Sequence, residues 1–330
     1  MLHKLLLIVA TGSVLVGNAQ TKNKMNQAKN PLLCDPMTGV CEVPTTTQAT
    51  SKDENKTTKP LKIIYYTDPI CSSCWGIEPQ LRRLKLEYGH DVAIEYHMGG
   101  LLPDWSYNSG GISKPSDVAH HWDEVSRYYN MPINGDVWLE DPLPSSYPPS
   151  IAFKAAQIQS KEKAIVFLRR MREMVFLQKK NITKWEHISA AAAGAGLDVA
   201  QLKKDYEGKA KQLFTADLEL GKKLGVRGFP TLIISNSKGE NATVYGFRPY
   251  TDFTAALKRL YPTLQQRPYD HGSEGLFAKY PTLTTREYAE LSETSIEEAQ
   301  QELTKMAAAG TVKKQTNKNG DIWLSATYKQ

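Results

Sequence analysis

Residues 62–75 read KIIYYTDPICSSCW, and this stretch decides the fold. Its first six residues are mostly β-branched or aromatic, a composition typical of a short buried strand. An Asp-Pro turn follows, and residues 78–88 then show a helical period that Gly89 ends. The sequence therefore places a Cys-x-x-Cys motif where a strand ends and a helix begins, with Cys71 at or just before the first helical turn.

This position suits the motif to thiol–disulfide exchange. The unpaired N–H groups and the positive dipole end of a helix N-terminus favour a thiolate, so we predict that Cys71 is the exposed thiol of low pKa. Cys74 lies three residues on, within reach to resolve a mixed disulfide. A zinc knuckle and a purely structural pair are alternatives, but no paired histidines lie nearby and the other two cysteines are too widely spaced. We expect no metal and no cofactor.

A second element lies far downstream, at residues 226–234 with the sequence VRGFPTLII. Proline is tolerated at the first residue of a strand, and the bond before it is the one place where a cis peptide is cheap. Phe229, Pro230 and Thr231 are therefore predicted to lie beside the dithiol, where they would offer strand-like pairing to an extended substrate.

Two neighbours of the thiols are further candidates. Asp68 could accept the proton of Cys74, although an Asp-Pro pair also forms turns without any chemical role. Trp75 is expected to shield the end of the helix. The two serines between the thiols should tune the redox potential, but nothing in the sequence sets its value, so the oxidase, reductase and isomerase directions all stay open.

The Asp-Pro-x-Cys-x-x-Cys-Trp motif after a strand, combined with a distant Gly-x-Pro-Thr before another, resembles the DsbA-like branch of the thioredoxin superfamily. The stretches that are similar to its SpxH group are residues 68–89, 135–138, 150–156 and 167–183. The resemblance covers roughly residues 61–264 and implies a thioredoxin fold with a helical domain inserted between its halves. Members of the SpxH group are adaptors that deliver a transcription factor to the ClpXP protease, which implies an alternative function without catalysis.

The pattern of the remaining chain agrees with this fold class. Helical patterns are found at residues 116–129, 149–160, 161–178, 183–194, 198–224 and 252–260. Strand patterns resume at residues 231–235 and 243–247. The order of elements predicts an α/β thioredoxin fold over residues 61–265, with an α-helical insertion at about residues 103–227.

The N-terminus has the features of a secretory signal: a basic start, an apolar stretch at residues 5–17 and a small-residue exit near Ala19. We expect residues 1–20 to be a signal peptide and the mature chain to be periplasmic or extracellular, without stable membrane insertion. One alternative is translation from Met25, which would leave the chain in the cytoplasm. Another is an uncleaved membrane anchor.

Residues 21–60 are rich in Thr, Lys, Asn and Gln and are predicted to be a flexible linker. Within it, Cys34 and Cys41 enclose six residues that include two turn-forming pairs. These cysteines could close a disulfide, exchange electrons with the main dithiol as an accessory pair, or be idle thiols.

Residues 266–282 are predicted to be a second linker, and residues 283–330 a small separate module. Two helical patterns, the second with a Ser295/Glu298 capping box, precede a hairpin that contains Trp323. This order resembles a winged helix, whose familiar use is DNA binding. The second helix is acidic, however, whereas phosphate neutralisation needs basic residues. We therefore predict a protein–protein or intramolecular docking module and expect no nucleic-acid partner.

Composition limits the remaining functions. The 330-residue chain is 41% hydrophobic and 23% charged, which is typical of a globular protein, and its net charge of +6 is too mild for a nucleic-acid footprint. We found neither a Ser/His/Asp arrangement nor a Gly-rich phosphate loop, so a hydrolase or a nucleotide enzyme is unsupported. We predict a thiol–disulfide oxidoreductase with Cys71 and Cys74 as catalytic residues. Its partners would be protein thiols or disulfides and an unidentified redox protein.

Overall fold

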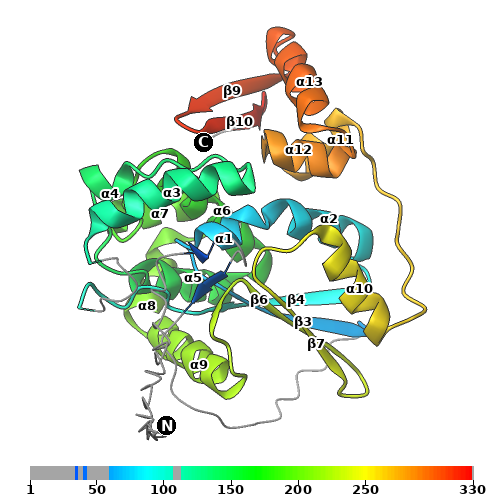
Figure 1. Ribbon diagram of the computed structural model, residues 1–330. Helices are drawn as coiled ribbons and strands as arrows, with labels where there is room; N and C mark the ends of the chain where they lie inside the picture. Colours follow the sequence, from blue (N-terminus) through cyan, green and yellow to red (C-terminus); the bar gives the residue numbers. More distant parts are fainter. Residues whose placement is uncertain (1–33, 36–39, 43–58, 107–112, 329–330) are drawn as a thin grey trace, which may run out of the picture.

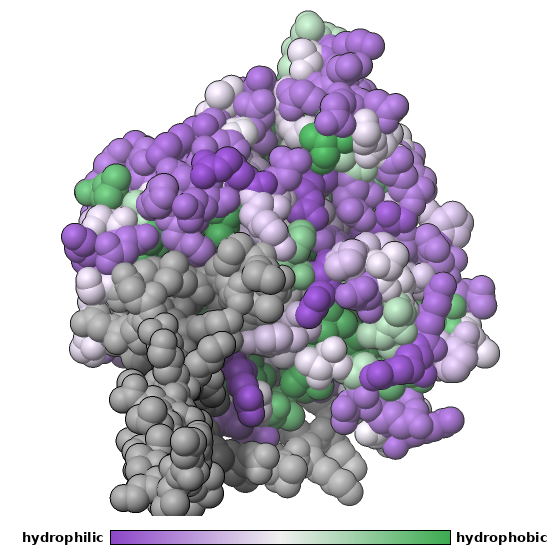
Figure 2. Space-filling view, in the orientation of Figure 1, coloured by the Kyte–Doolittle hydropathy of each residue, from purple (hydrophilic) through white to green (hydrophobic). Residues whose placement is uncertain are grey.

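The structure is a computed structural model, and it describes residues 34–35, 40–42, 59–106 and 113–328. The expected signal peptide and the alternative start near Met25 lie outside these residues. Within the described part of the chain, no helix is both long and apolar enough to cross a lipid bilayer. The face shown in Figure 2 is largely hydrophilic, with hydrophobic residues scattered over it.

Four strands form the central sheet. Their order is β4 (Val92–Met98), β3 (Leu61–Thr67), β6 (Thr231–Asn236) and β7 (Asn241–Tyr245). β3 runs parallel to β4 and antiparallel to β6, and β7 is antiparallel to β6. Tyr66 is the partner of Thr231 across β3 and β6, so Pro230 lies level with the end of β3. This register brings the two distant sequence elements together.

Helices α1 (Ser72–Gly76) and α2 (Glu78–Tyr88) follow β3 directly, and α10 (Tyr250–Leu260) packs against α2, β6 and β7. Figure 1 shows the inserted helices gathered to the left of the sheet. They are α3 (Pro115–Tyr129), α4 (Val137–Glu140), α5 (Tyr147–Gln159), α6 (Lys161–Leu177), α7 (Trp185–Gly194), α8 (Val199–Glu207) and α9 (Lys209–Lys223). The predicted thioredoxin fold with a helical insertion is confirmed.

One inserted helix is divided where a single helix was expected. The pattern at residues 198–224 is continuous, but α8 ends and α9 begins at Gly208, whose φ of −110° and ψ of −113° are not helical. Glycine lacks a Cβ and is less restricted to helical angles than other residues, so the chain changes direction there. Asp198 caps α8 by accepting a hydrogen bond from Gln201 N–H, as its residue type suggested.

Part of the expected N-terminal linker has a defined place, which corrects that prediction. Strand β1 (Cys34–Asp35) pairs with β2 (Val40–Glu42), and β2 pairs with β5 (Gly228–Phe229). The sequence did not predict these strands, because they contain few hydrophobic residues. They pair through their backbone with a strand that is distant in the sequence. The segment therefore belongs to the folded body at this point.

The C-terminal module begins earlier than predicted. The stretch at residues 266–282, expected to be a linker, contains α11 (Ser273–Lys279) and the start of β8 (Thr282–Thr284). Leu276 and Phe277 of α11 are buried in the core of the module, which explains why this stretch is ordered. The remaining elements are α12 (Thr285–Ser292), α13 (Ile296–Ala308), β9 (Val312–Asn317) and β10 (Gly320–Ser325).

The module has the expected helix, helix and hairpin order, with β8 added to the sheet in the order β8-β10-β9. The predicted capping box is confirmed, because Ser295 accepts from Glu298 N–H while the Glu298 carboxylate accepts from Ser295 N–H. Trp323 is fully buried in a core separate from that of the thioredoxin body.

The module docks onto the body through buried charges. Glu287 of α12 is fully buried and accepts two hydrogen bonds from the Arg169 guanidinium, at 2.7 and 3.0 Å. Arg82 lies 3.3 Å from the same carboxylate. At the hairpin, Lys318 pairs with Asp123 and Asp136 of the insertion at 2.6 and 2.7 Å. The module thus packs against the body, and a basic residue of the hairpin takes part in the contact.

Candidate functional site

The two thiols of the Cys-x-x-Cys motif lie at the start of α1. Cys71 is the N-cap, with extended backbone angles, and its Sγ accepts a hydrogen bond from Cys74 N–H at 3.2 Å. Trp75 N–H donates to the carbonyl oxygen of Cys71 at 3.1 Å, which begins the helix. Among the residues that the structure describes, neither cysteine is joined in a disulfide. The predicted placement of the motif between strand and helix is therefore confirmed.

The prediction that Cys71 is the exposed thiol of low pKa is wrong. Cys71 and Cys74 both have 0% exposure, so neither presents a thiol to solvent. Burial raises the pKa of Cys71, and its hydrogen bond to Cys74 adds to the increase. Burial alone would also raise the pKa of Cys74, but the hydrogen bond from Cys71 and the positive charge of Arg172 bring it below the ordinary value. The helix dipole does not outweigh complete desolvation at Cys71.

Arg172 of α6 is a site residue that the sequence did not reveal. Its guanidinium is fully buried and donates to Glu78, to Thr67 Oγ1 at 2.6 Å and to the carbonyl oxygen of Asp68 at 3.3 Å. Burial would lower the pKa of Arg172, but its electrostatic interactions, those with Tyr65 and Glu78 first, hold it above its ordinary value. The site thus contains a permanent positive charge supplied by the insertion. No spacing in the sequence links residue 172 to the motif.

Asp68 closes the turn before the thiols. Its buried carboxylate accepts from Ile70 N–H at 3.0 Å, Leu101 N–H at 2.8 Å and Ser146 Oγ at 2.9 Å. These bonds join the end of β3 to the loop after β4 and to the start of α5. Burial raises the pKa of Asp68 to about 6, although the three hydrogen bonds oppose the rise. Asp68 therefore forms the predicted turn, and its carboxyl group also connects the insertion to the dithiol site.

The raised pKa of Asp68 predicts a specific pH dependence of stability. The pKa is about 6 in the folded chain, against about 3.9 for an unfolded one. The folded chain therefore retains a proton that the unfolded chain releases, and the free energy of unfolding should fall by up to about 3 kcal/mol as pH rises from about 4 to 6. Asp68→Asn should remove this fall.

Urea unfolding at a series of pH values measures this effect as the difference between parent and variant. Asp104→Asn is the matched control, because the Asp104 side chain is exposed, and it should leave the pH dependence in place. An Asp68→Asn chain whose stability changes with pH as steeply as the parent would show that Asp68 does not titrate in this range.

Phe229, Pro230 and Thr231 lie beside the end of β3, and the Phe229–Pro230 peptide bond is cis. Thr231 Oγ1 donates to the carbonyl oxygen of Gly228 at 2.7 Å, which stiffens the turn. Phe229 packs so closely against Gly99 that a Cβ at that glycine would lie 1.7 Å from the Phe229 ring. The three residues are buried, and the backbone edge of Phe229 is paired with Cys41.

Trp75 is fully buried at the far side of α1. Its ring stacks on Phe176, with 5.6 Å between the ring centroids, and the Arg169 guanidinium lies 4.4 Å from the Trp75 ring centre. Its indole N–H donates to the carbonyl oxygen of Pro132 at 3.0 Å. Trp75 thus connects the motif helix to α6 and, through Arg169, to the docked C-terminal module.

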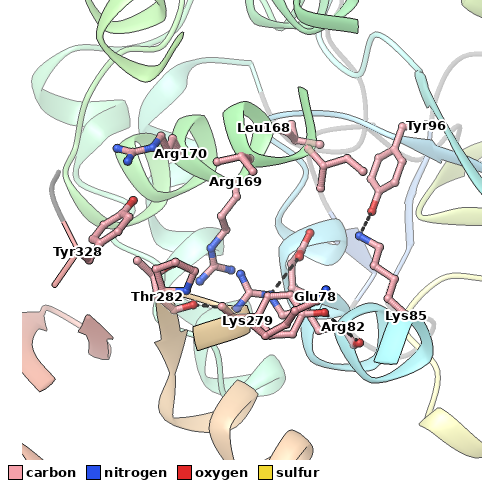
Figure 3. A pocket seen from close by; sticks show the side chains of 14 residues that line it. Glu78, Arg82, Lys85, Tyr96, Leu168, Arg169, Arg170, Lys279, Thr282 and Tyr328 are labelled. Atoms are coloured by element: carbon pink, nitrogen blue, oxygen red, sulfur yellow. Dashed lines mark hydrogen bonds and ion pairs between the residues drawn. The ribbon is translucent and has the colours of Figure 1, made fainter. Parts of the chain in front are cut away.

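A cavity of about 180 Å³ lies where α2, α6 and the C-terminal module meet (Figure 3). Its basic lining residues are Arg82, Lys85, Arg169, Arg170 and Lys279. Figure 3 shows Lys85 pointing to Tyr96, whose hydroxyl lies 2.6 Å from the ammonium group. Arg82 and Arg169 both pair with Glu287, and Arg169 also pairs with Glu173. The cavity is therefore a feature of the docking interface, apart from the dithiol. Among the described residues, no cluster of metal-ligating side chains occurs.

The fold and the dithiol site define a class, which is the thioredoxin-fold proteins of DsbA-like architecture. The family model described as thioredoxin matches residues 65–255. A putative protein disulfide isomerase from Nitrosomonas europaea is similar with a TM-score of 0.52 and 21% identity, over 62% of this chain and 97% of that one. The cytosolic disulfide reductase DsbM from Pseudomonas aeruginosa has a TM-score of 0.50 and 20% identity, over 60% and 99%.

The curated relatives are more specific. The ClpXP adapter protein SpxH of Halalkalibacterium halodurans is 32% identical over 305 residues, which are 91% of this chain and 99% of the relative. SpxH of Bacillus subtilis is 29% identical over 276 residues, covering 82% and 91%. The chain belongs to the SpxH family.

This relationship corrects two predictions. The predicted enzyme, a protein thiol–disulfide oxidoreductase, is wrong, because relatives with 27% to 33% identity are named ClpXP adapter proteins, and adaptors are not catalysts. The predicted partners, protein thiols or disulfides and a redox protein, are wrong on the same finding.

Proposed function

We propose that this chain is a non-enzymatic adaptor that brings a client protein to a ClpXP protease. The observation that carries the proposal is the match to a ClpXP adapter protein over 99% of that relative's length. Because the match covers 91% of this chain, it extends beyond the thioredoxin body. An adaptor needs no chemistry of its own, because holding a client beside a protease raises its effective concentration there.

The docked arrangement of the chain supports this role. Buried ion pairs join Glu287 of α12 to Arg169 of α6 and to Arg82 of α2 and hold the module on the body, so the two parts form one surface on which a client and a protease could be held in a set geometry. The turn at Phe229, Pro230 and Thr231 is our candidate for the client-binding part of the body, and because the backbone edge of Phe229 is paired with Cys41, a client strand would have to replace that pairing. Strand edges bind extended protein segments through backbone hydrogen bonds.

The C-terminal module is proposed to be a winged-helix-like docking unit. Its order of elements fits this description, and its three-stranded sheet places β10 between β8 and β9. Lys318 is used in ion pairs with the insertion, and the acidic face of α13 carries Glu297, Glu298 and Glu302. These features support contact with protein, since binding to phosphates needs free basic residues.

Location is a proposal that follows from the function. An adaptor must occupy the compartment of its protease, so we propose a cytoplasmic chain that starts near Met25 in preference to the expected export. Mass spectrometry of the native N-terminus in fractionated cells tests this. A processed N-terminus after Ala19 in an exported fraction would contradict it.

The function is tested by reconstitution with ClpXP of the same organism. The client is taken as a protein that accumulates when the gene for this chain is deleted and that ClpXP degrades in vitro. Adding the full-length chain should accelerate its degradation about tenfold or more. The Cys71→Ser/Cys74→Ser variant should accelerate it equally, because an adaptor does not use the dithiol for turnover.

Two results would contradict the proposal. One is a degradation rate unchanged by the chain. The other is a Cys71→Ser/Cys74→Ser variant that folds like the parent, as judged by its unfolding curve, and yet has lost the effect. An insulin-reduction assay on the parent is the matched control for catalysis and should show no activity above free dithiol.

A further inference from the structure

The cavity of about 180 Å³ between the body and the C-terminal module has walls from both parts (Figure 3). Residues of α2, β4 and α6 form its body side, and residues 279–282 and Tyr328 form its module side. An engineered protein cavity of about 150 Å³ is large enough to bind benzene. The space therefore suits a molecule with one ring, or with a short chain of similar size.

One part of the wall is apolar or aromatic. These lining residues include Ile165, Val166, Leu168, Tyr96, Tyr280 and Tyr328. The Arg82 guanidinium lies over the Tyr280 ring, 4.5 Å from its centre, and also donates to the carbonyl oxygen of Thr282 at 2.8 Å. These contacts join α2 to the module and fix the wall between them, so the cavity is already formed without a ligand.

The charged groups at the cavity do not cancel one another. Three guanidinium groups and three carboxylates form ion pairs at and next to it, and they belong to Arg82, Arg169 and Arg172 and to Glu78, Glu173 and Glu287. Lys85 and Lys279 line the same cavity. Within the described part of the chain, neither of these two lysines forms an ion pair with a carboxylate. The cavity therefore carries excess positive charge.

Lys85 of α2 is the group best placed to bind an anion. Its ammonium group donates to the Tyr96 hydroxyl at 2.6 Å, which is its one hydrogen-bond acceptor among the residues that the structure describes. An ammonium group has three donors. Burial would lower the pKa of Lys85, but its interactions with Tyr96 and Glu78 hold the pKa above its ordinary value, so the group is charged at neutral pH. A charged donor beside an apolar wall matches a carboxylate attached to an apolar group.

We propose that this cavity binds a small carboxylate with an apolar body, with the carboxylate on Lys85 and the apolar body against α6 and the tyrosine rings. Such a ligand contacts the body and the module at once. Its binding therefore favours the docked arrangement over any state in which the two parts separate. The inference goes beyond the adaptor function and does not depend on it.

Isothermal titration calorimetry on the full-length chain tests the site, with phenylacetate as the probe. Phenylacetate should bind with a Kd of about 1 mM or lower. 2-Phenylethanol has the same ring but a hydroxyl in place of the carboxylate, and acetate lacks the ring, so each should bind about tenfold more weakly or less. Failure of phenylacetate to bind at millimolar concentration would overturn the proposal. So would equal binding of phenylacetate and 2-phenylethanol.

Three variants place the binding in the cavity. Lys85→Met removes the charge, and Val166→Trp narrows the cavity at a position where the side chain is exposed. Each should weaken phenylacetate binding about tenfold. Lys258→Met is the matched control, because Lys258 is an exposed lysine of α10 outside the cavity, and it should bind like the parent. The proposal is wrong if the Lys85 and Val166 variants unfold in urea like the parent and bind phenylacetate equally well.

Hydrogen–deuterium exchange tests the link to docking. With phenylacetate at about ten times its Kd, amide exchange in residues 282–284 of β8 should slow about tenfold in the parent. Residues 232–236 of β6, within the central sheet, should exchange at the same rate with and without the ligand. The same phenylacetate concentration should have little effect on residues 282–284 in Lys85→Met. Unchanged exchange of these residues in the liganded parent would overturn the link between binding and docking.

Discussion

Glu287→Ala should lower the free energy of unfolding by about 3 to 5 kcal/mol and release the C-terminal module from the body. The Glu287 carboxylate is fully buried between Arg169, at 2.7 and 3.0 Å, and Arg82, at 3.3 Å. Burial would raise its pKa, but these two guanidinium groups hold it below the ordinary value. Without the carboxylate, two guanidinium groups stay in a desolvated interface without their main counter-charge.

The same substitution removes the capping box of α12, because Glu287 also accepts from Thr284 N–H at 2.8 Å. Loss of a cap adds about 1 kcal/mol. Urea unfolding measures the total, and limited proteolysis of residues 261–272, between α10 and α11, reports release of the module. The variant should be cut there much faster than the parent.

Glu290→Ala is the matched control on the same helix. Glu290 pairs with Arg83 at 3.2 Å, but its side chain is 23% exposed, so this variant should lose less than about 1 kcal/mol. If Glu287→Ala and Glu290→Ala lose equal stability, the buried ion pairs do not hold the module on the body.

Arg172→Met should destabilise the body by about 3 kcal/mol and raise the pKa of Cys74. Arg172 is the fully buried donor to Glu78, Thr67 and the carbonyl oxygen of Asp68. Methionine has a similar length but no charge, so Glu78 loses its short ion pair. The pKa of Cys74 should rise because the charge that opposes its desolvation is removed.

Thiolate absorbance in the ultraviolet against pH follows the titration of Cys74 when it is measured in a Cys34→Ser/Cys41→Ser/Cys71→Ser background, where Cys74 is the remaining cysteine of the four in the sequence. Arg170→Met is the control on the next residue of α6, where the guanidinium lies 5.0 Å from the Tyr328 ring centre and away from the thiols. The Arg170→Met variant should leave the pKa of Cys74 unchanged. An unchanged titration in Arg172→Met would show that the thiol does not sense this charge.

Local patterns were enough to predict much of this protein. The strand before the Cys-x-x-Cys motif, the helix after it and the capping box at Ser295 are confirmed, and so are the inserted helices except the one predicted at residues 198–224, which Gly208 divides. Such features depend on neighbours within a few residues, through hydrophobic period, turn formers and caps, so the order of residues determines them directly. The resemblance to the SpxH group rested on the same local motifs and pointed to the adaptor alternative.

Only the tertiary structure decided the chemistry of the site. Cys71 was expected to be the exposed thiol because a helix N-terminus favours a thiolate, but it has 0% exposure in the folded chain. Arg172 reaches the dithiol from a helix about 100 residues away in sequence, and the Cys34–Glu42 hairpin pairs with a strand near residue 228. Burial, charge pairing and strand register arise from contacts between segments that are distant in the sequence. The residue pattern within one segment does not determine which other segment it contacts.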